Sequence, residues 1–183
     1  MSKENNGIYR FLYILCFVLL VFLGKYLFMA PKFSDGHIAP EFSTTLVDGT
    51  PFSLSELRGN YVLLDFWGTW CGPCREQLPQ LKELHQKYHN KSIINANNFY
   101  IVSVALEREG DLERTKRAIA KLGLAWDYHI FDPISNFKIL NAKIATDLYG
   151  VREVPTKYLI GPDGGILGVN MSFDEMIKVI DGK

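Results

Sequence analysis

The sequence predicts an α/β fold: a central mixed β-sheet flanked by helices on both faces, with an N-terminal β-hairpin and one preceding transmembrane helix. Short apolar runs rich in β-branched and aromatic residues alternate with amphipathic segments, which is typical of layered α/β domains. A turn signal, Asp48-Gly49, separates two short β-rich runs ahead of the first long apolar run. An apolar segment near the N-terminus supplies the transmembrane helix.

The length and charge of the chain limit its organisation and its partners. The chain has 183 residues, which is enough for one domain with a buried core after an apolar N-terminal segment. We expect a tail over 1–10, a transmembrane anchor over 11–30, a linker over 31–40 and a folded domain over 41–183. Because 20 basic residues balance 20 acidic ones, no net field attracts nucleic acid, and nucleic-acid binding is disfavoured.

The expected anchor, Phe11–Ala30, carries a single charge, Lys25, near its end. As a helix it extends about 30 Å, the thickness of the hydrocarbon core of a bilayer. A cleaved signal peptide is the competing interpretation, but Phe28 stands where the processing site needs a small residue, which favours an uncleaved anchor. Cys16 lies in this segment, where packing in lipid is favoured over lipid modification. The flanking basic residues are nearly balanced and do not indicate which side the domain faces.

The elements after the hairpin follow from the hydrophobic pattern. We expect a short helical turn over 53–57 and a strand over 61–67 that is buried on both faces. A helix over 71–89 follows, and Pro79 should kink it. The charged run 107–117 is interpreted as the solvated start of a helix. The other expected elements are strands over 99–106, 126–131, 156–160 and 166–170, and helices over 111–122, 141–149 and 172–181.

Cys71 and Cys74 form a Cys-x-x-Cys pair that directly follows the buried strand and opens a helix. This spacing puts the two sulfurs on one helical turn, close enough for a disulfide. At a helix N-terminus, free N–H groups and the positive end of the dipole stabilise a thiolate on Cys71. That thiolate attacks a substrate disulfide, and Cys74 then attacks the mixed disulfide and releases the substrate. Pro73 suits the first helical turn, where its missing N–H costs little.

Two further residues are expected to take part in the chemistry. Asp65 lies on the buried strand before Cys71, and the functional interpretation makes it the proton acceptor for Cys74. The alternative is a structural carboxylate paired with a lysine. Pro155 stands where a turn leads into a strand. A cis Val154–Pro155 bond would leave backbone groups free to hold an extended substrate segment.

The segment WCGPC, with DFW before it and REQLP after it, resembles the thioredoxin superfamily. The order of anchor, hairpin, redox motif and Val154-Pro155-Thr156 is similar to its membrane-tethered TlpA/ResA-like branch of AhpC/TSA-like redoxins, over about residues 39–180. The resemblance implies a thioredoxin fold, with Cys71 as the exposed nucleophile, Cys74 as the buried resolving thiol and Pro155 in the cis form. The positions expected to contact substrate are Trp70, Gly72, Pro73, Val154 and Pro155.

The resemblance also implies an activity and a location. It implies a thiol-disulfide oxidoreductase with no cofactor other than the redox-active Cys71–Cys74 disulfide. The expected role is reduction of disulfides in exported proteins, such as apocytochrome c before haem attachment, with electrons from a CcdA/DsbD-type transmembrane donor. The domain would lie on the extracytoplasmic side of the bacterial cytoplasmic membrane. Some members of the branch use a glutamate near the second strand in place of Asp65, and Glu107 and Glu109 are the acids near that position.

Three other interpretations compete with dithiol exchange. A zinc site would need His85 and His89, which lie about three turns along the same helix and cannot share a metal with Cys71. A peroxiredoxin-like thiol peroxidase needs one activated cysteine with Thr and Pro shortly before it, whereas Cys71 follows Trp70 and has a partner three positions on. A membrane-tethered, non-enzymatic binding module would not need two cysteines at an accessible helix start.

Overall fold

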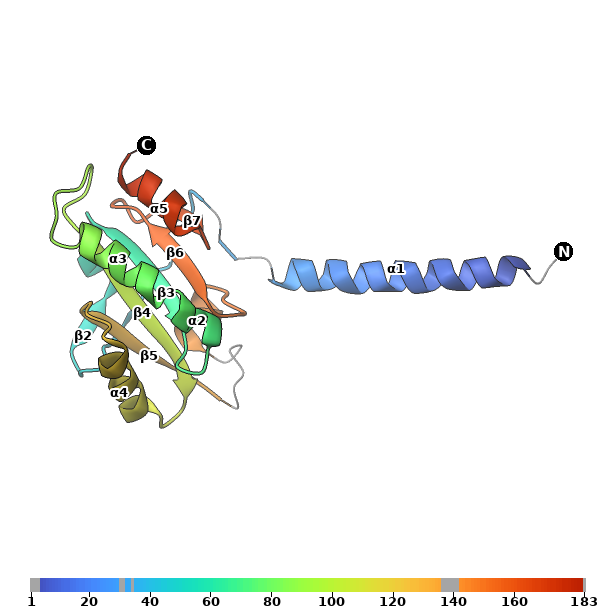
Figure 1. Cartoon of the computed structure of the whole chain (residues 1–183), viewed down its shortest axis with the longest axis horizontal. Coiled ribbons are helices and arrows are strands. Elements are labelled where there is room, and N and C mark those ends of the chain that lie inside the picture. The colour runs from blue at the N-terminus through green and yellow to red at the C-terminus, as the bar shows by residue number, and fades with distance from the viewer. Residues whose placement is uncertain (1–3, 30–31, 34, 136–141, 183) are drawn as a thin grey trace. The chain divides into compact units, whose positions relative to one another are not determined.

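The structure is a computed structural model that describes residues 4–29, 32–33, 35–135 and 142–182. The chain divides into two compact units, Met1–Ala30 and Pro31–Lys183. The first unit is a single helix, α1 (Glu4–Met29), coloured blue in Figure 1. Its stretch Gly7–Phe28 is 22 residues long and apolar enough to cross a membrane. The helix begins before the expected anchor because hydrophobicity marks only a lipid-spanning length, whereas the helical backbone continues through the polar residues that precede it.

The second unit is built on a five-stranded sheet with the strand order β5-β4-β3-β6-β7 (Figure 1). The central strand β3 pairs in parallel with β4, and β4 pairs in parallel with β5. The pairs β3–β6 and β6–β7 are antiparallel, so the sheet is mixed as predicted. The strands are β3 (Tyr61–Trp67), β4 (Phe99–Arg108), β5 (Tyr128–Ile134), β6 (Thr156–Ile160) and β7 (Ile166–Val169).

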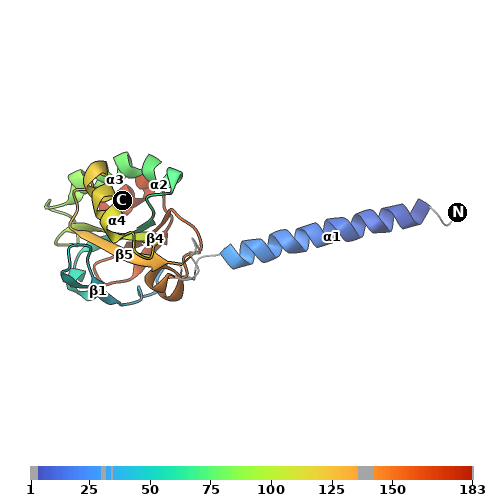
Figure 2. The ribbon, with the colours of Figure 1, turned by 90° about the horizontal axis from the view of Figure 1, so that it is seen from below.

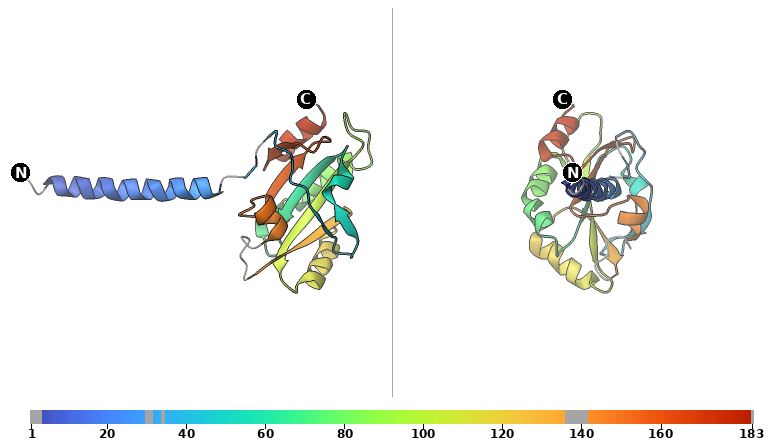
Figure 3. Two further views of the ribbon diagram at one scale, coloured as in Figure 1. Left: turned by 180° about the vertical axis from the view of Figure 1, so that it is seen from behind. Right: turned by 90° about the vertical axis from the view of Figure 1, so that its right-hand side faces the viewer.

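Helices cover one face of this sheet, and the hairpin with two short helical segments covers the other. Figures 2 and 3 show α2, α3, α4 and α5 together on one side and β1 on the opposite side. The helices are α2 (Gly72–Glu76), α3 (Leu78–Tyr88), α4 (Leu112–Leu122) and α5 (Phe173–Ile180). The opposite side consists of β1 (Ser43–Thr45), β2 (Pro51–Ser53), η1 (Leu54–Leu57) and η3 (Lys143–Leu148). The prediction of helical elements on both faces is therefore confirmed.

Every residue of β3 is buried, because the strand lies in the middle of the sheet with both faces covered. Side chains of a strand alternate between the two faces. Leu63 and Trp67 belong to the core on the helix side, whereas Leu64 and Phe66 belong to the core on the hairpin side. Asp65 therefore faces the helices, on the side of the sheet that carries the cysteines.

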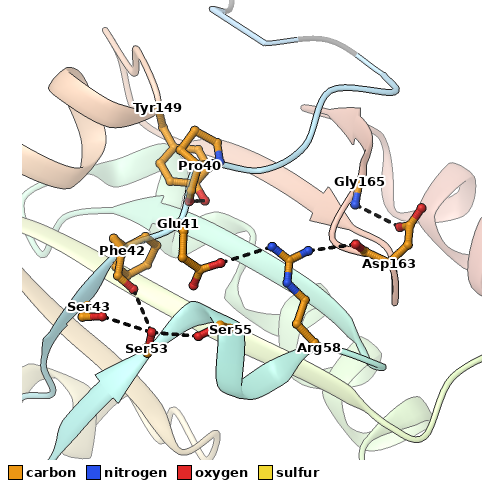
Figure 4. Close-up of polar contacts among 10 residues, drawn as sticks. All are labelled: Pro40, Glu41, Phe42, Ser43, Ser53, Ser55, Arg58, Tyr149, Asp163 and Gly165. Atoms are coloured by element: carbon orange, nitrogen blue, oxygen red, sulfur yellow. Dashed lines mark hydrogen bonds and ion pairs between the residues drawn. The ribbon is translucent and has the colours of Figure 1, made fainter.

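The segment that leads into β1 is fixed to the domain by the side chains of Tyr149 and Arg58 (Figure 4). The Tyr149 hydroxyl donates to the carbonyl oxygen of Pro40 at 2.8 Å. The Arg58 guanidinium donates to the Glu41 carboxylate at 3.1 Å and to the carbonyl oxygen of Asp163 at 2.9 Å. The end of the stretch expected as a linker is thus attached to the domain.

Three boundaries differ from the prediction. The helix over 71–89 is two helices, α2 and α3, that meet at Gln77, because Pro79 takes a position in the first turn of α3 and does not kink a continuous helix. Strand β5 begins after Trp126, whose indole Nε1 instead donates to Ser103 Oγ in the core at 2.6 Å. The expected helix over 141–149 is the π-helical segment η3, and residue 141 lies outside the described residues.

Candidate active site

The two cysteines lie at the start of α2, just after the loop that follows β3. Cys71 is the N-cap of α2, and its Sγ accepts a hydrogen bond from the backbone N–H of Cys74 at 3.2 Å. The two residues form a disulfide with a Cα–Cα distance of 5.3 Å, which is ordinary for a disulfide. Pro73 occupies the first turn of α2, as expected. After reduction, the same backbone N–H and the helix dipole stabilise negative charge on the Cys71 sulfur.

The expected difference in exposure between the two cysteines is wrong for this oxidised form. Cys71 and Cys74 are each 4% exposed, so Cys71 is not the exposed member of the pair. The cause is the disulfide itself, which holds the Cys71 sulfur against α2, together with the loop before β6, where the Val154 carbonyl oxygen lies 3.8 Å from Cys71 Sγ. Trp70, at 40%, and Pro73 are exposed beside the pair.

The loop that ends at Pro155 comes next to the cysteines because of sheet pairing. Strand β6 begins at Thr156, directly after Pro155, and Thr156 pairs with Phe66 near the end of β3. The Val154–Pro155 peptide bond is cis, as the resemblance implies. Two residues that are far from Cys71 in the sequence, Val154 and Pro155, thus lie beside the redox pair.

The C-terminal end of β4 holds the loop between β3 and α2. The Glu107 carboxylate accepts hydrogen bonds from the backbone N–H of Thr69 and, at 3.1 Å, from its hydroxyl. The Trp70 indole N–H donates to the carbonyl oxygen of Leu106 at 2.8 Å. Burial raises the pKa of Glu107, and the hydrogen bonds from Thr69 oppose that rise. The loop before Cys71 is therefore attached to β4 at two consecutive residues.

This placement corrects the interpretation of the charged run 107–117 as a solvated helix start. Glu107 is 1% exposed and belongs to β4, which continues to Arg108, whereas Glu109 is exposed. The sequence pattern could not separate them, because an acid at the buried end of a strand and an acid in the following turn look alike without a partner. Of the two glutamates considered as alternatives to Asp65, Glu107 is engaged with Thr69.

We expect Glu107→Ala to lower the free energy of unfolding by about 1–3 kcal/mol, because the Thr69 N–H would lose its acceptor in a half-buried position. Urea denaturation monitored by tryptophan fluorescence measures the change. Glu109→Ala is the matched control: it removes a neighbouring, exposed carboxylate and should leave the unfolding free energy unchanged. Equal losses in the two variants would contradict the assignment of Glu107 as the loop anchor.

Asp65 is a buried acid with a buried lysine opposite it. Asp65 is 3% exposed and pairs across the β3–β6 ladder with Lys157, which is 5% exposed. Burial raises the pKa of Asp65 to about 6, and the charge of Lys157 opposes that rise. Burial also lowers the pKa of Lys157. Lys157 is thus the lysine that stands opposite Asp65 in the ladder, whereas its Nζ donates to Gln77 Oε1 and no ion pair between Asp65 and Lys157 is among those of the described residues. Its signal in the sequence is the single charged residue of β6.

The comparison with known proteins places this site in a family. The model of the AhpC/TSA family matches residues 36–168. The chain belongs to the AhpC/TSA family. Thiol-disulfide oxidoreductase ResA of a Bacillus cereus strain is 32% identical over 168 residues, which cover 90% of this chain and 87% of the relative. Thioredoxin-like protein YneN of Bacillus subtilis (strain 168) is 31% identical over 150 residues, covering 80% of this chain and 79% of the relative.

Solved structures of thiol-disulfide oxidoreductases share the fold of this domain. A thiol-disulfide oxidoreductase from Bacteroides fragilis is 28% identical, with a TM-score of 0.64, and covers 78% of this chain and 99% of its own. The thioredoxin domain of a thiol-disulfide oxidoreductase from Bacteroides vulgatus has the same TM-score of 0.64 at 23% identity, covers 81% of this chain and 99% of its own, and supports the fold alone. The predicted thioredoxin fold is confirmed. This AhpC/TSA member is a thiol-disulfide oxidoreductase, and its Cys71–Cys74 pair supports dithiol–disulfide exchange.

Proposed function

We propose that this oxidoreductase reduces disulfides in exported proteins, with Cys71 as the attacking thiolate, Cys74 as the resolving thiol and Asp65 as the acceptor of the Cys74 proton. The observation that carries the proposal is the N-cap position of Cys71, whose sulfur receives the Cys74 N–H at 3.2 Å. A sulfur held in this way is stabilised as a thiolate, which is the reactive form in disulfide exchange.

The steps balance in atoms and electrons. The Cys71 thiolate attacks one sulfur of a substrate disulfide, forms a mixed disulfide and expels the other substrate sulfur as a thiolate. Asp65 takes the proton of Cys74, and the Cys74 thiolate attacks Cys71 Sγ and expels the second substrate thiolate. The substrate gains two electrons and, from the protein and solvent, two protons. The chain is left with the Cys71–Cys74 disulfide present in the structure.

The substrate surface we propose consists of positions around the disulfide: Trp70, Gly72, Pro73, Val154 and Pro155. Trp70 presents a large exposed ring beside the cysteines. A side chain added at Gly72 would meet no described atom within 4 Å, so the start of α2 is open toward an incoming segment. The carbonyl of Val154, close to Cys71 Sγ, offers a backbone acceptor to an extended peptide. An apocytochrome c whose haem-attachment thiols are oxidised to a disulfide is a substrate of this class.

We further propose that the apolar helix α1 is an uncleaved anchor in the bacterial cytoplasmic membrane, with the domain on its extracytoplasmic side. The 22-residue length of Gly7–Phe28 supports an anchor, and a signal sequence passes the same length test. A protein outside the cytoplasm needs electrons brought across the membrane, and a CcdA/DsbD-type transmembrane reductant is the donor we propose. The mass of the mature chain purified from membranes distinguishes anchor from signal peptide, because cleavage would remove the first unit.

The direction of electron flow gives the experiment that tests the function. We expect a reduction potential near that of thioredoxin, about −270 mV, because the same Gly-Pro dipeptide separates the cysteines. Equilibration of the full-length chain with dithiothreitol in detergent micelles measures it. A potential near about −120 mV, the value of a strong oxidant, would contradict a reductant. Consumption of hydrogen peroxide faster than reduction of a protein disulfide would instead favour the thiol peroxidase.

A further inference from the structure

Two histidines lie next to each other on the surface of α3. His85 and His89 have the i, i+4 spacing that places two side chains together on one face of a helix. Their rings are nearly parallel: the centroids are 4.5 Å apart and the planes meet at 17°. Both side chains are half-buried, so the pair is partly open to solvent. The dithiol exchange proposed above uses neither histidine.

Aromatic side chains hold the two imidazoles in place. The His85 ring lies 6.1 Å from the Trp126 ring, and the His89 ring lies 5.5 Å from the Tyr100 ring. Trp126 is itself fixed, because its indole N–H donates to Ser103 Oγ at 2.6 Å. Fixed neighbours leave the imidazoles few alternative positions, so the pair is preorganised for a ligand that binds both rings.

The backbone determines which nitrogen of His89 can bind a metal. Its Nδ1 lies 3.1 Å from the carbonyl oxygen of Phe99. Because a carbonyl oxygen only accepts hydrogen bonds, Nδ1 carries the proton, and the lone pair of the neutral ring lies on Nε2. An imidazole that donates one N–H to a backbone carbonyl and binds through its other nitrogen is the usual arrangement of metal-bound histidines. His89 is thus prepared to bind a cation through Nε2.

The surroundings of His85 favour the neutral ring, which is the form that binds metals. Burial lowers the pKa of His85, and His89 lowers it further because two imidazolium ions would repel each other. The negative charge of Asp127 opposes this shift. The same negative charge would stabilise a cation bound to His85. Within the part of the chain that the structure describes, no hydrogen bond occupies a ring nitrogen of His85.

The ligands determine the class of metal. Imidazole nitrogen suits late first-row transition ions, whereas Mg²⁺ and Ca²⁺ prefer oxygen. A metal–imidazole bond is about 2.0–2.1 Å long, so two nitrogens on one ion lie at most about 4.2 Å apart. Rings at 4.5 Å reach this separation when they tilt toward each other about their Cβ–Cγ bonds. The described residues contain no group of three or more such ligands, so water would complete the coordination.

We propose that His85 and His89 form a binding site for a late first-row divalent cation, coordinated by one nitrogen of each ring and by water. Among the ions of this row, Cu²⁺ forms the strongest complexes, and we expect it to bind most tightly. The site is separate from the Cys71–Cys74 pair, which lies at the start of the preceding helix. It does not depend on the proposed substrate or on the direction of electron flow.

Electron paramagnetic resonance with one equivalent of Cu²⁺ tests this site. The sample is the oxidised full-length chain in detergent micelles at pH 7, without a histidine tag and with Cys16→Ser, so that no free thiol remains. We expect the splitting pattern of two coordinated imidazole nitrogens. His85→Gln and His89→Gln should each remove one nitrogen. Each should also weaken binding about tenfold or more by isothermal titration, since even partners outside the ligand set contribute about 10–100-fold.

The matched control is His37→Gln, which removes an exposed histidine elsewhere in the domain and should retain both nitrogens and the affinity. The inference is overturned if Cu²⁺ binds either His85→Gln or His89→Gln as tightly as the starting chain. Displacement of Cu²⁺ by an equal concentration of Mg²⁺ would also overturn it, because Mg²⁺ does not compete for imidazole. Circular dichroism checks the fold of each variant. If His89→Gln unfolds through loss of the contact with Phe99, His85→Gln decides the question alone.

Discussion

Cys71→Ser should reduce the rate of protein-disulfide reduction by roughly a thousandfold or more. A serine oxygen cannot form the mixed disulfide, and the remaining thiol, Cys74, is 4% exposed and sits inside α2. The N–H that stabilises charge on the Cys71 sulfur belongs to Cys74 itself, so Cys74 cannot receive the same stabilisation. Turbidity from reduced insulin chains, with dithiothreitol as the electron source, measures the rate.

The matched control for this variant is Cys16→Ser, which removes the cysteine of α1. Cys16 lies outside the catalytic unit and is a free thiol among the residues that the structure describes, so its replacement should leave the insulin rate unchanged. Undiminished activity in Cys71→Ser would refute the nucleophile assignment. A loss of activity in Cys16→Ser would show that the chain works through a cysteine that the mechanism does not use.

Cys74→Ser should convert turnover into accumulation of a covalent complex. The Cys71 thiolate still attacks and forms the mixed disulfide, but no thiol one helical turn away can resolve it. We expect each chain to retain about one substrate molecule, visible as a band on a non-reducing gel that disappears on addition of dithiothreitol. In cells, the same variant would hold its physiological substrate, and mass spectrometry of the trapped partner would identify it.

The double variant Cys71→Ser/Cys74→Ser is the control for this trapping experiment and should yield no complex. The outcome that contradicts the assignment is a complex in Cys71→Ser and none in Cys74→Ser, because it would exchange the roles of the two sulfurs. This experiment distinguishes the nucleophile from the resolving thiol, which exposure does not, because Cys71 and Cys74 are each 4% exposed in the oxidised structure. The roles therefore rest on the hydrogen bond to Cys71 and on the start of α2.

Local patterns account for the parts of the fold that could be predicted. The apolar run of β3 and the Cys-x-x-Cys pair at the start of α2 are both encoded within a few neighbouring residues. What the sequence left open depends on pairing between distant segments. Whether a lysine stands opposite Asp65 is decided by the register of β3 against β6, and whether Glu107 is solvated is decided by its contact with Thr69. Periodicity along one segment carries no information on either contact.

The burial of the Cys71–Cys74 disulfide affects which molecules can exchange electrons with it. In the oxidised domain Cys71 and Cys74 are each 4% exposed, and the Val154 carbonyl oxygen lies 3.8 Å from Cys71 Sγ. Because little of either residue is open to solvent, we expect small thiols to reduce this disulfide slowly and a protein that contacts Trp70 to reduce it faster. We therefore expect the domain to exchange electrons with protein partners in preference to small thiols. The choice of redox partner would then depend on the shape of the docking surface as well as on reduction potential. Two pairs of redox proteins with similar potentials could thus work in one compartment without exchanging electrons with each other.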